Sequence, residues 1–259
     1  MKTAATLRLY APMCLLLAGI AHGARAAEPG TITAYRPSVS TPAQLPAVGQ
    51  LEYEAGFLST RDGDTRRDSI PVLFKLALSE QWGVLVGGDA YVSKREPGGA
   101  RARGLGDTEV VLKRAFLIDS ATAFGLELAA KLPTAKDSIG SGKADYTVNT
   151  IVSRDLGRIH LDANANLTRL GAVDPGTGRN QTGLAVAFST QFSERWSATA
   201  ELSGTHQRGA GTTAQLLLAA GFSPSKHVTI DIGVAHGLNS ASPDWSLFGG
   251  LVVPLAQLW

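Results

Sequence analysis

Apolar and polar residues alternate strictly along many short stretches of this chain. In residues 159–168, one set of alternate positions is wholly apolar and the other is wholly polar. The apolar set is Ile159, Leu161, Ala163, Ala165 and Leu167, and the polar set is His160, Asp162, Asn164, Asn166 and Thr168. Successive side chains of a strand point to opposite faces, whereas a helix would mix the two sets. The pattern therefore predicts a strand with one apolar and one polar face.

The same alternation recurs along most of the chain after residue 48. It is clear in residues 50–57, 124–131, 196–203 and 228–235. Weaker versions lie near residues 69–78, 83–94, 106–116, 146–155, 182–191, 213–222 and 244–257. Together these segments predict about twelve strands, each close to the ~9–11 residues that a tilted strand needs to cross a bilayer.

The connections between these segments alternate between short and long. Short polar turns fall near residues 79–81, 118–120, 156–158, 193–195 and 223–226. Longer links rich in Gly, Asp and Arg fall at about residues 59–68, 95–105, 133–145, 170–181, 207–212 and 238–243. Short turns on one side and longer loops on the other are typical of outer-membrane barrels. The sequence therefore predicts an all-β fold, a transmembrane antiparallel up-and-down β-barrel.

Charged residues on the polar face indicate which face points inward. A soluble barrel fills its interior with apolar side chains, and burying many charges in a dry core costs several kcal/mol for each ion. We therefore expect the apolar face to meet lipid and the polar face to line a hydrated lumen. The expected lumen-lining residues are Glu52, Glu54, Lys75, Asp89, Glu109, Lys113, Glu127, Lys131, Asp162, Asn164, Asn166, Glu201 and Asp231.

Aromatic residues support a membrane setting. Trp82, Trp196 and Trp245 lie near predicted strand ends, where the aromatic belts of membrane proteins are found. The last residue is Trp259, and a terminal aromatic residue is the signal that the barrel-assembly machinery reads, although Gln257 stands where that signal usually has a hydrophobic residue. We expect outer-membrane lipid and this machinery as partners, the latter through the C-terminal strand.

The N-terminal segment has the three parts of a secretory signal peptide. Lys2 and Arg8 precede an apolar run over residues 11–20, and the small-x-small triplet Ala24-Arg25-Ala26 follows it. The run is about half the ~20 residues of a membrane-spanning helix. We expect cleavage after Ala26, which gives a signal peptide at 1–26, an extended Pro-rich arm at 27–47 and the barrel at 48–259. The arm is expected in the periplasm or tucked into a barrel mouth.

Charge and cysteine usage exclude several classes of function. The chain has 24 basic and 22 acidic residues and no basic cluster with interleaved aromatics, so nucleic-acid binding has no electrostatic support. The single cysteine, Cys14, lies in the predicted signal peptide, which leaves no disulfide or thiol nucleophile in the barrel. The histidines are scattered without metal-ligand spacing. We expect no cofactor and no metal.

Candidate catalytic groups are weak. The loop 104–107 lacks the third glycine and the following helix of a dinucleotide-binding motif. His206 lies near Ser203 and Thr205, but in a strand residue 206 points away from the face that 203 and 205 share. His160 shares a face with Asp162 without a marked serine nearby. We therefore expect no enzymatic activity.

Several short motifs resemble a known family. Residues 36–38, the prolines at 42 and 46, and Gly49-Gln50-Leu51-Glu52-Tyr53-Glu54-Ala55-Gly56-Phe57 resemble the opening of a family of outer-membrane transporters named for the meta-pathway of phenol degradation. Residues 104–110 resemble its entry into a middle strand, and residues 126–133 with 140–142 resemble the segment that follows. Tyr35 stands where that family usually has an acidic residue. The resemblance implies uptake of small molecules, aromatic or apolar ones included.

These observations favour one function and leave two alternatives open. We expect a monomeric barrel that lets small solutes pass passively through its lumen, although about twelve strands make a narrower barrel than the 16–18 strands of open porins. A closed structural or adhesive barrel that acts through its external loops is the first alternative. A barrel lipid hydrolase is the second.

Overall fold

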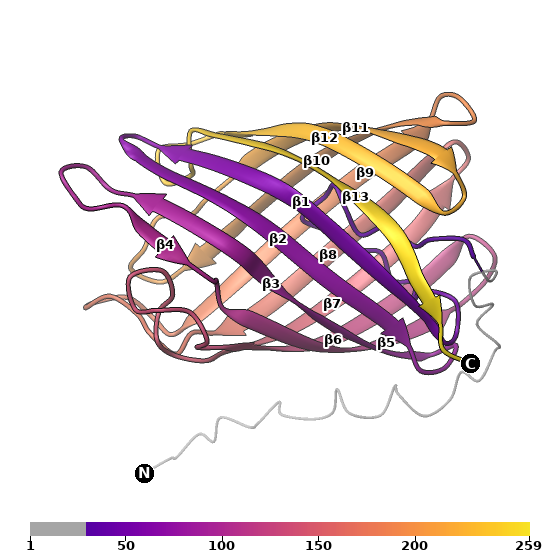
Figure 1. Cartoon of the computed structure of the whole chain (residues 1–259), viewed down its shortest axis with the longest axis horizontal. Coiled ribbons are helices and arrows are strands. Elements are labelled where there is room, and N and C mark those ends of the chain that lie inside the picture. Colours follow the sequence, from indigo (N-terminus) through magenta and orange to yellow (C-terminus); the bar gives the residue numbers. More distant parts are fainter. Residues whose placement is uncertain (1–29) are drawn as a thin grey trace, which may run out of the picture.

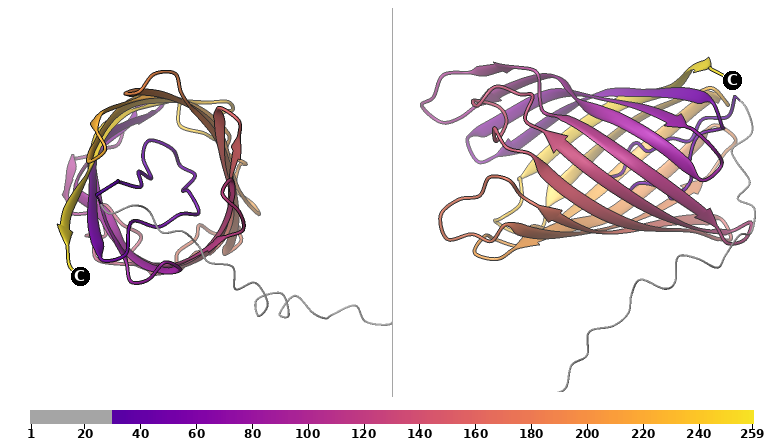
Figure 2. Two further views of the ribbon diagram at one scale, coloured as in Figure 1. Left: turned by 90° about the vertical axis from the view of Figure 1, so that its right-hand side faces the viewer. Right: turned by 90° about the horizontal axis from the view of Figure 1, so that it is seen from below.

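The computed structural model describes residues 30–259. The expected signal peptide and its cleavage site lie outside these residues. Within them, no helix is long and apolar enough to cross a membrane. The strands wrap into a closed cylinder, and a segment preceding β1 lies inside it (Figures 1 and 2).

The wall is a single antiparallel sheet. Its strands are β1 (Gln50–Asp62), β2 (Thr65–Ala77), β3 (Trp82–Arg95), β4 (Ala102–Gly104), β5 (Thr108–Leu117), β6 (Thr122–Leu132), β7 (Asp145–Leu156), β8 (Ile159–Arg169), β9 (Asn180–Gln191), β10 (Trp196–Gln207), β11 (Gln215–Ser225), β12 (Val228–Gly237) and β13 (Trp245–Gln257). The sheet closes where β1 pairs with β13. β4 and β5 both pair with β3 and share one position in the wall. The described residues therefore form a closed barrel of 12 strand positions, as the alternation predicts.

The connections separate the two ends of the barrel. The end called here the turn end has the short connections at 78–81, 118–121, 157–158, 192–195 and 226–227, together with Trp259. The opposite end, the loop end, has the longer connections at 96–101, 133–144, 170–179, 208–214 and 238–244.

One predicted loop is wrong. Residues 59–68 are mostly strand, because β1 runs to Asp62 and β2 begins at Thr65 around a tight turn at Gly63, which has φ +54°. The two-residue loop is Gly63-Asp64, and a glycine at the first loop position suits such a tight hairpin. Residues 59–68 are polar because this hairpin extends beyond the apolar part of the wall, and their polar composition led to the prediction of a loop.

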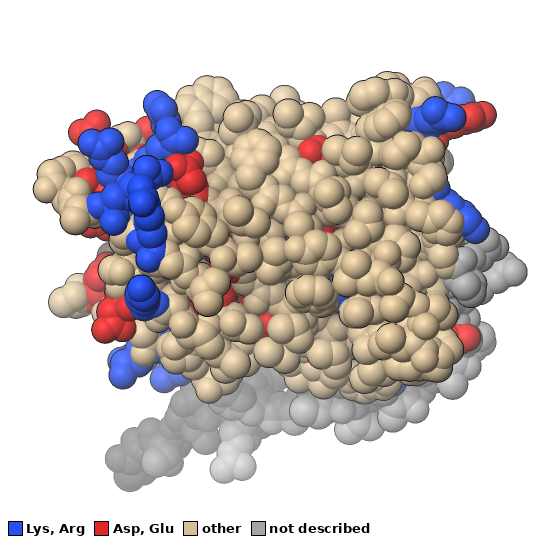
Figure 3. All heavy atoms as spheres, in the orientation of Figure 1, with Lys and Arg blue, Asp and Glu red and all other residues tan. Residues whose placement is uncertain are grey.

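The two faces of the wall have opposite character. Leu184 and Ile232 on the outer face are 66% and 60% exposed, whereas Lys75 and Lys113 on the inner face are 0% exposed. Trp82, Trp196 and Trp245 each begin a strand and are exposed on the outer face. Figure 3 shows the middle of one outer face almost free of charge, with charged side chains gathered toward the ends. Apolar side chains therefore face outward, and ionisable side chains face the interior.

Residues 30–47, called here the arm, enter the interior at the turn end and return to it (Figure 2). Three clusters of buried apolar residues join the arm to the wall. They are Tyr35 with Leu85 and Val111, Ala43 with Ala123 and Ile151, and Leu45 with Ala77 and Ala115. Most of the apolar core of this barrel is thus a contact between the wall and the arm.

Candidate functional site

The first leg of the arm runs beside β1. The backbone N–H of Thr33 donates to Glu52 at 3.0 Å, and that of Tyr35 donates to Glu54 at 2.8 Å. Both segments are extended, so a step of two residues along the arm matches a step of two along the inward face of β1. Lys75 joins the two carboxylates, at 2.9 Å from Glu52 and 2.5 Å from Glu54. The inward charges of β1 and β2 therefore act as anchors for the arm.

Tyr35 is the central anchor. The ammonium groups of Lys75 and Lys113 lie 4.3 and 4.2 Å from its ring centroid, within the range of cation–π attraction. Its hydroxyl donates to the carbonyl of Gln44 at 2.8 Å, which ties the two legs of the arm together. Burial raises the pKa of the Tyr35 phenol well above its ordinary value, and the Glu127 and Glu54 carboxylates raise it further. Tyr35 therefore stays a neutral hydrogen-bond donor.

Lys113 and Glu127 hold the second leg. Their side chains form an ion pair at 3.0 Å, and Lys113 is fully buried. Lys113 also donates to the carbonyl of Pro42 at 2.5 Å. Glu127 accepts from Asn149 at 2.8 Å and from the Thr41 hydroxyl at 3.3 Å. A buried charge pair needs its remaining hydrogen-bonding positions filled, and here the arm fills part of them.

The tip of the arm crosses to the opposite wall. Arg36 makes two hydrogen bonds of 2.9 Å to the carboxylate of Asp231 on β12. Glu201 on β10 accepts from the backbone N–H groups of Val39 and Ser40, both at 2.8 Å, and from the Ser40 hydroxyl at 3.0 Å. The arm is thus held from both sides of the lumen.

The second leg also contacts β7 and β8. The N–H of Ala43 donates to the Ser153 hydroxyl at 2.8 Å, and this hydroxyl donates to Asp162. The Asn164 side chain lies 3.1 Å from the Thr41 hydroxyl.

The structure brings many of the expected lumen-lining residues together around the arm. Those that contact it are Glu52, Glu54, Lys75, Lys113, Glu127, Asn164, Glu201 and Asp231. The others pair elsewhere on the inner wall. Asp89 pairs with Arg67 at 2.6 Å, and Lys131 lies 2.9 Å from Asp145. Glu109 stands opposite Lys131 in register, Asp162 lies beside His160 and Asn166 lines a cavity.

Sequence reasoning missed the arm residues Tyr35, Arg36 and Ser40. The sequence of the wall strands does contain an indication that Asp231 needs a partner from outside the wall. The cross-strand neighbours of Asp231 are Gly221 and Gly250, so the wall offers this carboxylate no cation. An inward acid flanked by glycines needs a partner from another segment.

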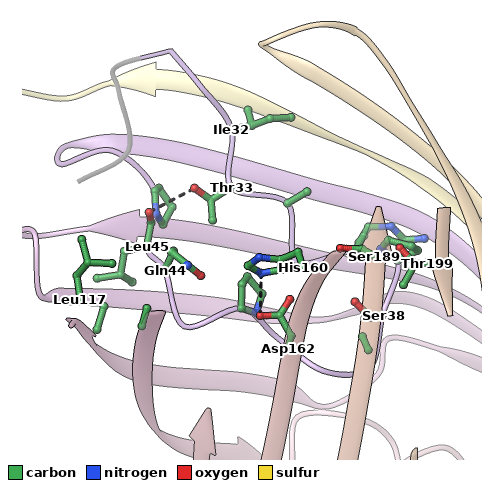
Figure 4. Close-up of a pocket in the computed structure, with 18 of the residues that line it drawn as sticks. Ile32, Thr33, Ser38, Gln44, Leu45, Leu117, His160, Asp162, Ser189 and Thr199 are labelled. Atoms are coloured by element: carbon green, nitrogen blue, oxygen red, sulfur yellow. Dashed lines mark hydrogen bonds and ion pairs between the residues drawn. The ribbon is translucent and has the colours of Figure 1, made fainter. Parts of the chain in front are cut away.

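Cavities remain between the arm and the wall. One of about 370 Å³ lies against Pro37, Pro42, His160, Ser189 and Thr199 (Figure 4). A second of about 540 Å³ lies toward the turn end and shares His160, Ser189 and Thr199 with the first. A third of about 220 Å³ lies toward the loop end. Val39 lines this third cavity. The tip of the arm therefore lies between the cavities at the turn end and the cavity at the loop end.

His206 Nδ1 lies 2.8 Å from the Thr212 hydroxyl at the exposed loop end, whereas both ring nitrogens of His160 are taken by carboxylates. His160 Nδ1 lies 2.5 Å from Asp155 and Nε2 lies 3.2 Å from Asp162. Both ring nitrogens therefore face carboxylates, and a base for a serine hydroxyl needs one of them. Among the described residues, no group of three or more His, Cys, Asp or Glu side chains is placed to hold a metal ion.

A closed antiparallel barrel with an apolar exterior and a charged interior has the architecture of an outer-membrane porin. The chain is similar to the solved KdgM porin, with a TM-score of 0.54, 11% identity and coverage of 80% of this chain and 99% of that one. It is also similar to the NanC porin, with a TM-score of 0.56, 8% identity and coverage of 79% and 100%. At these identities the likeness shows the fold alone. No family model and no curated protein matches the chain, so the resemblance to the phenol-degradation family stays a prediction.

Proposed function

We propose that the protein is a bacterial outer-membrane channel through which small solutes pass passively, along the space between the arm and the β8–β11 side of the lumen. The observation that carries this proposal is the position of the cavities, which lie on both sides of the arm tip against short inward side chains of that wall.

The outer face of the barrel supports the membrane part of this proposal. A closed sheet satisfies every backbone group internally, as a lipid environment requires. Its exposed Leu, Ile and Phe side chains would be costly in water and suit acyl chains. In this placement the turn end faces the periplasm, and β13 with Trp259 presents the signal for the barrel-assembly machinery.

The lining of the 370 Å³ cavity suggests the class of solute. Pro37, Leu45 and Leu117 give it apolar surface, while Ser189 and Thr199 give it hydroxyl groups. This combination suits a small molecule with an apolar body and one or two polar groups, such as a phenolic aromatic. Balanced charges around the lumen give no strong preference for anions or cations.

The test is to narrow the proposed route without touching the arm. Thr199 pairs directly with Ser189 across the inner face, and both line the two turn-end cavities. We expect Thr199→Trp to lower single-channel conductance and the rate of liposome swelling severalfold. Ala198→Trp is the matched control, because its side chain lies one residue away on the opposite face. Equal conductance for wild type and Thr199→Trp would contradict the route.

A closed structural or adhesive barrel is the second candidate. It is favoured by the arm, which fills much of the lumen with a buried network of charges and hydrogen bonds. This candidate predicts that the wild-type protein neither conducts ions nor permits liposome swelling, so the same measurements decide between the two.

A further inference from the structure

The outer wall at the loop end carries a row of arginines. Arg61 on β1 pairs in register with Arg66 on β2, and Arg66 pairs with Arg95 on β3. Two more arginines, Arg101 and Arg103, lie beside this row. We call the five residues Arg61, Arg66, Arg95, Arg101 and Arg103 the arginine rim, and all five are exposed.

The rim faces outward, because its arginines follow apolar residues on the same strand faces. Phe57, Ile70 and Tyr91 share those faces with Arg61, Arg66 and Arg95, and they are 45%, 44% and 39% exposed. Arg61 follows Phe57 by four residues, a distance of roughly 13 Å along a strand. The guanidinium groups therefore lie just beyond the apolar band, at the level where lipid headgroups begin.

The rim is electrostatically unbalanced. Like charges directly opposite each other on neighbouring strands are destabilising, and here three arginines are aligned across three strands. Asp68 lies 3.0 Å from Arg66 and 3.7 Å from Arg101. Among the described residues, no carboxylate forms an ion pair with Arg61, Arg95 or Arg103. An anion bound between these side chains would relieve the repulsion.

The rim is also one-sided. On the neighbouring wall at the same end, the corresponding outward residues are His236 and Trp245, whose rings stack at 4.2 Å. Figure 3 shows Lys and Arg side chains gathered at the loop end, over the strands that carry the rim. A localised basic patch of this kind fits a discrete ligand better than a general attraction to the whole membrane surface.

We propose that the arginine rim binds the phosphate groups of an anionic glycolipid in the outer leaflet. Phosphate is the natural ligand, because the planar guanidinium forms two parallel hydrogen bonds to it and keeps its charge at all relevant pH values. The apolar residues next to the rim would take the acyl chains. The inference rests on the outer-membrane placement proposed above, and it assigns a specific lipid contact to one quarter of the outer wall.

The test compares lipid retention by two charge-matched variants of the full chain. The rim variant carries Arg61→Gln, Arg95→Gln and Arg103→Gln. The control carries Arg154→Gln, Arg158→Gln and Arg195→Gln, which removes the same charge from exposed positions at the turn end. Folded protein in detergent is titrated with bisphosphorylated lipid A, and bound lipid is counted by native mass spectrometry. We expect the rim variant to bind roughly 100-fold more weakly than wild type and the control to bind normally, because each of the three removed arginines contributes about 1 kcal/mol near an anionic lipid.

Two further arms identify the ligand. Dephosphorylated lipid A is expected to bind wild type no better than it binds the rim variant, and millimolar inorganic phosphate is expected not to displace lipid A. Equal retention by both variants would overturn the proposal, as would full binding of the dephosphorylated lipid or displacement by free phosphate. Conductance in bilayers without lipid A is measured in parallel. If the wild-type barrel conducts but binds lipid A no better than the rim variant does, only the lipid proposal is contradicted. If the wild-type barrel binds lipid A but does not conduct, only the proposed channel is contradicted.

Discussion

The two sides of the inner wall differ in the length of their side chains. On β1, β2, β5 and β6 the inward positions carry the long charged residues Glu52, Glu54, Lys75, Lys113 and Glu127. On β8–β11 many inward positions carry the short residues Ala185, Ala187, Ser189, Thr199 and Ser203. The long side chains reach the arm and hold it, while the short ones leave the cavities open. A single closed wall can thus provide both a support and a passage.

The largest effect is expected from removing a charge on the supporting side. Lys113→Met keeps the length of the side chain but leaves Glu127 buried without its cation and removes the hydrogen bond to Pro42. Breaking one partner of a buried pair typically costs about 3 kcal/mol or more. We expect the free energy of unfolding in detergent to fall by about that amount, as measured by urea titration.

A control and a rescue sharpen this prediction. Lys131→Met removes two ion pairs at the loop end, to Asp107 and Asp145, where the lysine side chain is 26% exposed, and should cost about 1 kcal/mol or less. Adding Glu127→Gln to Lys113→Met should recover part of the loss, because no unpaired charge then remains. Equal destabilisation by Lys113→Met and Lys131→Met would contradict the prediction that the buried ion pair contributes more to stability than the exposed ones.

A smaller effect is expected at the tip of the arm. Arg36→Ala removes both hydrogen bonds to Asp231, whose side chain is fully buried. Because cavities flank Arg36 and let water reach the carboxylate, we expect a loss of about 2 kcal/mol, as for hydrogen bonds to a charged group. Arg36 also lines both turn-end cavities, so the variant should conduct better than wild type in planar bilayers. Arg67→Ala, which breaks the pair with Asp89 near the loop end, is the matched control and should leave conductance unchanged. A drop in conductance for Arg36→Ala would show that the tip keeps the route open.

The smallest effect is expected from fixing the arm in place. The Ala43 N–H donates to the Ser153 hydroxyl at 2.8 Å, so these two residues are neighbours and the double variant Ala43→Cys/Ser153→Cys is the crosslink to test, with disulfide formation checked by the loss of free thiol. If the arm is a stationary support, the oxidised and reduced forms of this double variant should conduct equally. Lower conductance in the oxidised form would show that the arm moves during passage and that the support is itself a gate.

The fold was largely predictable because each strand separates two different surroundings. Alternation of the kind seen in residues 159–168 arises because one face of the strand meets lipid and the other meets a polar interior. This alternation predicted nearly every strand. It failed in residues 59–68, because a hairpin that extends past the apolar band loses the apolar half of the pattern.

The candidate site was predictable only on the wall side. Alternation marks Glu201 and Asp231 as inward, but it carries no information about what they bind. Their partners lie in a Pro-rich segment without a period, and the Arg36–Asp231 contact joins residues 195 positions apart. Such contacts follow from the closed shape of the barrel, which local pattern does not encode.

The path of the arm has a consequence for assembly. The Gly30 N–H donates a hydrogen bond to the Gln50 side chain, and the Ile32 N–H donates one to the carbonyl of Lys226 in the β11–β12 turn. The arm therefore enters and leaves the barrel at the same end. Residues 30–47 form a loop that enters and leaves through one opening of the barrel, and none of these residues passes through to the other end. The cylinder can therefore be completed before this segment docks, and the segment can withdraw without opening the seam between the first and last strands.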